Sequence, residues 1–380
     1  MTPDTQSRLT ALRQDLHRHP DLSGDEASTA TKIADILEAL NPDEIVTGVG
    51  GHGVVARFNG AKPGPSLALR CELDALPIVE QNTVPYASER TGIAHLCGHD
   101  GHMVILLAVA EHLAQNRPER GQVALIFQPA EETGQGAAAV CADPRFARNA
   151  PDIMLALHNL PGVELGHVEL CTGPANCASR GLVIRLSGKT SHAAAPQDGL
   201  SPASAMVRLM PALARLGPGG ALNSDYALTT LTHARLGDAT FGVAPGEAEI
   251  WITLRTVTDA RMDRLLAEAQ QLAQSVADTA GLGVEFRIDD VFDACINHGE
   301  AVALLHDACV AENVPVRLTS EPQRFSEDFG QFGATAHCAM FWLGAGTAHP
   351  QLHNPDYDFP DAVIPVGVSV FLRVIRSVLG

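Results

Sequence analysis

Short apolar runs alternate with helical segments through residues 1–160, and this alternation constrains the fold more than any other feature of the chain. Amphipathic helices are predicted at 7–19 and 27–40, and a third helix follows Cys97. Between them lie runs with the length and composition of buried strands, at 53–58, 66–71, 122–128 and 152–157. Strands separated by helices indicate an α/β fold with a mixed, largely parallel sheet.

The pattern changes near residue 180. It becomes β-α-β-β-α-β, with predicted strands at 181–186, 227–236, 248–256 and 284–288 and helices at 201–216 and 259–280. This order is typical of a small split sheet with two helices on one face. Because 380 residues exceed what one hydrophobic core holds, we predict two domains. A catalytic domain comprises residues 1–179 and 292–380, and a second domain is inserted at 180–291.

One short segment concentrates groups that bind metals. It reads Leu96-Cys97-Gly98-His99-Asp100-Gly101-His102 and is followed at once by an apolar run with helical spacing. The cluster is therefore predicted to lie in a tight turn at a helix N-terminus. Thiolate and neutral imidazole bind zinc-like divalent ions. A chance cluster is the alternative, because a lone cysteine or histidine is more often structural.

Further polar residues follow the predicted strands. Asp74 comes after the second strand, Glu131 and Glu132 come after the third, and His158 comes after the fourth. Open α/β sheets build their sites outside the carboxyl ends of the strands. We therefore expect these four side chains to lie close to Cys97.

Composition excludes some partners. The formal net charge of −18 argues against nucleic acid or an anionic membrane, since both require a basic face. No apolar run approaches a membrane span, and the first residues lack an apolar signal region. The eight cysteines form no Cys-x-x-Cys pair, which favours reduced thiols. We expect a cytoplasmic protein with a small-molecule substrate.

Ordered motifs along the chain resemble the metallopeptidase family that includes aminoacylases, hippurate hydrolases and auxin-conjugate amidohydrolases. The matching pieces are Leu16-His17-Arg18-His19-Pro20-Asp21, Asp74-Ala75-Leu76-Pro77, Cys97-Gly98-His99-Asp100-Gly101-His102, Gln128-Pro129-Ala130-Glu131-Glu132, Leu157-His158-Asn159, Gly188-Lys189-Thr190-Ser191-His192, Glu327-Asp328-Phe329 and Leu352-His353-Asn354-Pro355. Each piece is weak alone, but together they occur in family order over nearly the whole chain.

The resemblance implies a site for two divalent metal ions, zinc, manganese, cobalt or nickel. By position, its ligands are Cys97 as the bridge, His99 and His158 on one ion, and Glu132 and His353 on the other. His349 is the alternative for the last ligand. Two ions about 3.5–4 Å apart can polarise an amide carbonyl and bind a hydroxide between them.

The family also implies roles for neighbouring carboxylates. Glu131 takes the place of the general base. Adjacent residues of an extended chain point to opposite sides, so Glu131 and Glu132 are not both expected to face the ions. Asp74 is expected to orient a metal-bound imidazole.

The inserted domain resembles a dimerisation lid, which implies a homodimer. His192 is expected to contact the oxyanion or a carboxylate, and Arg255 to grip a substrate carboxylate. Without the resemblance, both are equally compatible with solvated surface residues. Two departures from the family pattern are Glu72, where an aspartate is usual, and Gly242, where an asparagine is common.

These expectations describe an enzyme that cleaves the amide bond of N-acyl amino acids, such as N-acetyl or N-benzoyl conjugates. A dipeptidase or small-peptide exopeptidase with the same site is the alternative among enzymes. A non-catalytic ligand-binding relative is the alternative from another class. It predicts a missing ligand or base, and the sequence lacks none.

Overall fold

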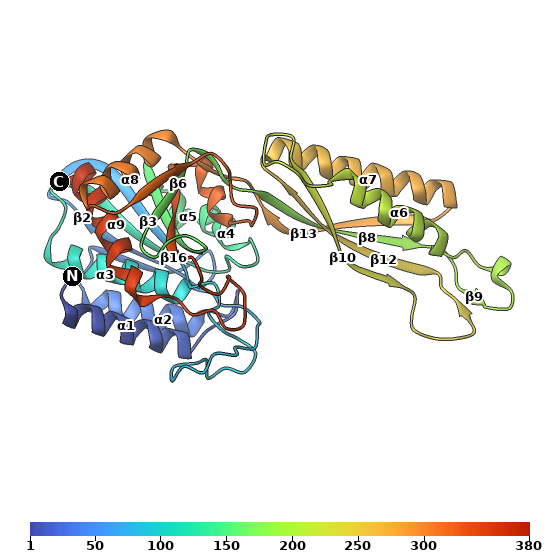
Figure 1. Ribbon diagram of the computed structural model, residues 1–380, viewed down its shortest axis with the longest axis horizontal. Coiled ribbons are helices and arrows are strands. Elements are labelled where there is room, and N and C mark those ends of the chain that lie inside the picture. Colours follow the sequence, from blue (N-terminus) through green and yellow to red (C-terminus); the bar gives the residue numbers. More distant parts are fainter. The chain divides into compact units, whose positions relative to one another are not determined.

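A computed structural model describes residues 1–380, which form two compact units (Figure 1). The first unit comprises residues 1–175, 295–320 and 328–380, and the second comprises 176–294 and 321–327. Segment 321–327, which the sequence assigns to the first domain, thus belongs to the second unit. The other junctions lie a few residues outside the predicted bounds of 180 and 291.

The first unit is built on an eight-stranded mixed sheet. Its order is β1 (Glu44–Val49), β2 (Gly53–Asn59), β4 (Arg120–Gln128), β3 (Lys62–Glu72), β5 (Ile153–Pro161), β16 (His337–Gly346), β6 (Val168–Cys171) and β15 (Val316–Thr319). The central strands β4, β3, β5 and β16 are mutually parallel. Antiparallel pairing occurs for β1 with β2, β2 with β4, and β16 with β6. The predicted fold class is confirmed.

Helices pack on this sheet and complete its core. They are α1 (Pro3–Arg18), α2 (Ala27–Ala39), α3 (His99–Gln115), α4 (Gly136–Ala142), α5 (Pro144–Ala147), α8 (Gly299–Ala311) and α9 (Ile364–Leu379). Nearly every residue of α3 up to Ala110 is buried, as is typical of a helix that is apolar on all sides. Short elements complete the unit: β7 (Gly173–Asn176), which pairs with β14 (Cys295–Asn297), and the 3-10 helices η2 (Asp328–Ala334) and η3 (Asp361–Val363).

One helix corrects an expectation about membranes. The segment 361–379 is long and apolar enough to cross a membrane by length and composition, so the expectation that no run approaches a span is wrong. Half of its apolar window is buried inside the protein. Val368, Phe371 and Val374 belong to the core of the first unit. Packing of α9 in that core accounts for its apolar composition.

The second unit has its own sheet and core. Its antiparallel strands are ordered β10 (Ala227–Leu236), β12 (Glu247–Thr256), β8 (Ala178–Ser187) and β13 (Gly283–Phe292). Helices α6 (Ala203–Leu216) and α7 (Asp259–Ala280) cover one face (Figure 1). The chain order β8-α6-β10-β12-α7-β13 is the predicted one. A small ladder joins β9 (Ser191–His192) to β11 (Val243–Ala244), and η1 (Pro196–Asp198) follows β9.

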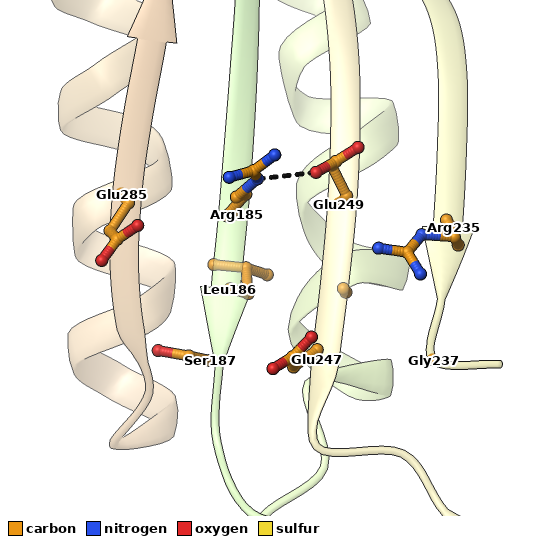
Figure 2. Close-up of a pocket in the computed structure, with 9 residues that line it drawn as sticks. Arg185, Leu186, Ser187, Arg235, Gly237, Glu247, Glu249 and Glu285 are labelled. Carbon is orange, nitrogen blue, oxygen red and sulfur yellow. Dashed lines mark hydrogen bonds and ion pairs between the residues drawn. The ribbon is translucent and has the colours of Figure 1, made fainter.

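The opposite face of this sheet is charged. Leu182, Ile184 and Leu186 of β8 face the helices, whereas Arg185 alternates to the other side. There Arg185 donates to Glu249 of β12 at 2.7 Å, and Figure 2 shows the two side chains directed toward each other. This is the alternation expected of an antiparallel sheet with one solvated face.

Candidate metal centre

A glycine shapes the turn that carries Cys97 into α3. Gly98 caps the helix with a φ of +90°, a conformation that side chains rarely adopt. A Cβ atom there would lie 2.4 Å from Nδ2 of Asn159. That same Nδ2 donates to the carbonyl oxygen of Cys97 at 2.7 Å. The turn therefore places Cys97 just before the helix and His99 at its first position, as predicted.

Three neighbouring parallel strands deliver the remaining groups. Strand β3 ends two residues before Asp74, β4 ends three residues before Glu131, and β5 carries His158 near its carboxyl end. These strands are adjacent in the order β4-β3-β5. Their polar residues therefore meet at one edge of the sheet, as the sequence predicted.

The ligand atoms form overlapping groups, each with all its atoms within 4.8 Å of one another. The groups are Cys97 with His99 and His158, Cys97 with Glu132 and His353, and His99 with Glu131 and Glu132. Sγ of Cys97 lies 3.4 Å from Nε2 of His158, and Nε2 of His353 lies 3.6 Å from Oε2 of Glu132. Cys97 is shared by the group of His99 and His158 and the group of Glu132 and His353, which suits a bridging position. All six predicted residues are thus brought together.

Hydrogen bonds orient two of the imidazoles for coordination. Nδ1 of His99 donates to the carbonyl oxygen of Asp74, and Nδ1 of His158 donates to that of Asn159, both at 2.8 Å. In the neutral form of each ring the lone pair then lies on Nε2, which points into the cluster. Nε2 of His99 is buried and has no hydrogen-bond partner. Metal-bound histidines are usually oriented in this way.

The electrostatics of the cluster also fit cations. Burial opposes a charge on His99, but its contact with Asp74 and the charges of Glu72 and Glu132 outweigh that effect and raise its pKa to about 10. Burial, together with Glu132 and Glu131, raises the pKa of the Cys97 thiol well above its usual value. The protein thus gathers negative charge that divalent cations would balance, and such cations would favour the thiolate. The donor set fits two metal ions.

Two details differ from the sequence reasoning. Residues 131–134 form a turn rather than extended chain, and Glu131 and Glu132 each approach Nε2 of His99 to 3.9 Å. The premise that they face opposite sides is therefore wrong. Glu132 also forms a ligand group with Cys97 and His353, and its Oε2 lies 3.6 Å from Nε2 of His353.

The second detail concerns how Asp74 acts. It orients His99 through its backbone carbonyl, while its carboxylate Oδ1 is 3.6 Å from Nδ1. Its other oxygen, Oδ2, accepts from the backbone N–H of Glu132 at 3.0 Å and from Ser23 Oγ at 2.7 Å. Asp74 thus supports both an imidazole and the glutamate turn.

The geometry distinguishes the two histidines of the loop after β16. His349 contacts the carbonyl oxygen of Asp358 through Nε2 at 2.6 Å and packs edge-on against Tyr357. His353 instead lies beside Glu132, with a φ of +66°. Its backbone N–H donates to the carbonyl oxygen of Leu96 at 2.8 Å, which ties this loop to the Cys97 turn. The cluster therefore includes His353 rather than His349.

Sequence reasoning missed a buried network beneath the site. Glu72 accepts from Nδ1 of His102 at 2.7 Å and also from Arg70. Arg70 donates to Asp328 at 2.8 Å, and all four side chains are shielded from solvent. Nε2 of His102 accepts from the N–H of Asn159 at 3.2 Å. The departure at Glu72 therefore has a structural role, and the matched motifs around residues 72, 102 and 328 were its only signal.

His192 and Arg255 both lie in the second unit. His192 is exposed and pairs with Val243 in the β9–β11 ladder. Arg255 is partly buried, donates to the carbonyl oxygen of Arg324 at 3.1 Å and to Ser326 Oγ at 2.8 Å, and forms no ion pair. Burial lowers the pKa of its guanidinium. A half-buried guanidinium without a carboxylate partner suits an anionic ligand.

The fold and donor set are those of a metal-dependent hydrolase. The chain belongs to peptidase family M20/M25/M40, whose sequence model matches residues 68–377, so the resemblance seen in the sequence is confirmed. N-acetyldiaminopimelate deacetylase of Bacillus velezensis is 30% identical over 373 residues, covering 96% of this chain and 98% of the relative. N-acetylcysteine deacetylase of Bacillus subtilis is 28% identical, covering 98% and 97%.

A solved structure supports the same assignment. The YXEP protein of Bacillus subtilis, described as a dinuclear metal binding peptidase from the M20 family, superposes with a TM-score of 0.84 at 26% identity. The match covers 100% of this chain and 99% of that one.

Proposed function

We propose that this chain is an amidohydrolase that cleaves the amide bond of N-acyl amino acids with the help of two divalent metal ions. The observation that carries the proposal is the pair of ligand groups that share Cys97, with Glu131 beside them. Family membership supports hydrolysis, and the deacetylase relatives support an N-acyl amino acid as substrate.

Each residue of the cluster has a proposed role. Cys97 would be the ligand shared by the two ions, His99 and His158 would hold one of them, and Glu132 and His353 would hold the other. Zinc, manganese, cobalt and nickel all suit this mixed set of donors. When bound, such ions polarise the amide carbonyl and make water more acidic. Glu131 takes the proton of the attacking water and passes it to the leaving nitrogen.

Two residues of the second unit bind the substrate. Arg255 pairs with its carboxylate, which would supply the missing counter-charge. His192 donates to the oxyanion in the site of a partner subunit. The proposed homodimer forms through the second unit, whose sheet has two edge strands, β10 and β13, able to pair or be covered.

The test is a substrate panel of N-acetyl, N-benzoyl and indole-acetyl amino acids alongside dipeptides, assayed after chelation and metal add-back. We expect hydrolysis of N-acyl amino acids that chelation abolishes and added metal restores. Faster hydrolysis of dipeptides would favour the exopeptidase alternative. A chain that binds no metal and hydrolyses nothing would be a non-catalytic ligand-binding relative.

The subunit arrangement has its own test. Mixed dimers of His192→Ala and Glu131→Gln chains contain one site with both groups intact. If His192 acts across the interface, they recover activity toward half of wild type. Mixed dimers as inactive as the two parents would contradict that role.

A further inference from the structure

We propose that Glu26 is a positioning residue that fixes the turn carrying Glu131 and Glu132. Its side chain accepts hydrogen bonds from the backbone of Gly24 and Ala130, and it acts through the backbone of Ala130. The functional consequence depends on the proposed role of Glu131, whereas the structural consequence does not.

Glu26 is a buried carboxylate at the start of α2. Its Oε1 accepts from the N–H of Gly24 at 2.9 Å and from the N–H of Ala130 at 2.8 Å. The side chain is fully buried, and Oε2 has no hydrogen-bond partner. Burial raises the pKa of this carboxyl group. Burying a carboxyl group costs free energy. Capping α2 does not explain this cost, because the Glu26 side chain makes no capping hydrogen bond to the helix.

The turn that Glu26 contacts is one that needs support. Ala130 has a φ of +50°, a conformation that costs energy for any residue with a Cβ atom. Its carbonyl oxygen accepts from the N–H of Gly136 at 3.0 Å. Without the hydrogen bond to Glu26, the backbone N–H of Ala130 would lose its acceptor while the residue kept its strained conformation. Glu26 therefore favours the strained conformation over relaxed alternatives.

A second carboxylate holds the turn from its other side. Oδ2 of Asp74 accepts from the N–H of Glu132. Glu26 and Asp74 thus hold the backbone N–H groups immediately before and after Glu131. Both carboxylates also bind the segment of Ser23 and Gly24. With its flanking amides fixed, Glu131 has a defined direction, and displacements of about 1 Å can change rates by about 10²-fold.

The experiment compares Glu26→Met with the matched control Glu26→Gln. Methionine approximates the size of glutamate but offers no oxygen acceptor, whereas glutamine keeps an oxygen where Oε1 lies. We expect Glu26→Met to lower kcat by about 10- to 100-fold with KM changed by less than about threefold. Glu26→Gln should stay within about threefold of wild type. Hydrogen exchange of peptide 129–136, measured by mass spectrometry, should accelerate in Glu26→Met only.

A double-mutant cycle tests whether Glu26 acts through the turn. Ala130→Gly removes the cost of a positive φ, so the loss of kcat caused by Glu26→Met should shrink in that background. If Glu26→Met does not fold, Glu26→Asp takes its place, because one methylene less prevents the carboxylate from reaching both amides.

Several results would overturn the proposal. The first is a normal kcat and normal hydrogen exchange in Glu26→Met. The second is a loss of kcat in Glu26→Gln that equals the loss in Glu26→Met. The third is a loss of kcat from Glu26→Met that is unchanged in the Ala130→Gly background. Failure of the proposed function is recognised separately, by full activity in Glu131→Gln. The exchange measurement would still decide the role of Glu26 in that case.

Discussion

His17 makes the stability of the first unit depend on pH. Its ring is fully buried, with Nδ1 2.8 Å from Asp100 and Nε2 3.1 Å from Glu80. Burial alone would lower its pKa, but the two carboxylates outweigh burial and raise the pKa to about 9 from 6.5. The folded state therefore binds this proton more tightly than the unfolded state does, and protonated His17 stabilises the fold.

The size and pH window follow from the two pKa values. A raised pKa gives stability that is fully present below the unfolded value and disappears as pH rises through the folded value. With values of 6.5 and about 9, His17 contributes about 3 kcal/mol at pH 6, about 2 kcal/mol at pH 7.5 and less than about 0.5 kcal/mol at pH 9. We expect His17→Gln, which cannot carry the charge, to lose that contribution.

Urea unfolding of wild type and His17→Gln between pH 6 and 9.5 measures this difference. The chain has two tryptophans, of which Trp342 lies in the first unit and Trp251 in the second. A Trp251→Phe background therefore limits the fluorescence signal to the unit that contains His17. Subtracting the free energy of unfolding of His17→Gln from that of wild type at each pH removes the contribution of groups that titrate equally in both proteins. A difference that stays constant from pH 6 to 9.5 would refute the reasoning.

Further predictions concern the metal centre. Glu131→Gln should keep its metal, measured by elemental analysis, and lose about 10²–10⁴-fold in kcat, whereas Glu132→Gln should lose metal; normal kcat in the first variant would contradict the base assignment. Cys97 should resist alkylation in metal-loaded protein and react after chelation, and equal labelling in both states would show that it is not a ligand. Gly98→Ala should lower the free energy of unfolding by about 2–4 kcal/mol, because its Cβ would lie 2.4 Å from Asn159; unchanged urea unfolding would contradict that clash.

Much of the fold could be predicted because its signals are local. The bounds of α7 agree with the predicted 259–280, since Thr258 caps its start and Gly281 ends it with a φ of +67°. Elements such as β6, β15 and α8 were not predicted. β6 and β15 are four-residue strands, too short for a clear period. Their places are set by tertiary pairing with each other, which no local pattern encodes.

The site shows the same division. Cys97, His99, Glu131, Glu132 and His158 could be predicted because strand ends and the Cys97 turn are visible in the sequence, whereas the choice of His353 over His349 rested on the family resemblance. The turn at Glu131 could not, since its geometry depends on Ala130 at positive φ and on a bond to Glu26, 104 residues away. The network under the site joins Arg70 to Asp328 across 258 residues. Contacts of that separation leave no spacing to detect.

Two sets of buried acidic groups in the first unit differ in what balances their negative charge. Asp100 faces Arg13 and His17, and Glu72 faces Arg70 and His102, so protein cations and donors compensate these charges within the fold. In the metal cluster, by contrast, Cys97 and two glutamates lie near the Nε2 atoms of His99 and His158. The Nδ1 atoms of these two imidazoles donate to backbone carbonyl oxygens. When a divalent cation binds at their Nε2 atoms, such imidazoles supply lone pairs rather than charge. Divalent cations would therefore stabilise the cluster in the way that arginine stabilises the acids beneath it, and stability should rise with bound metal.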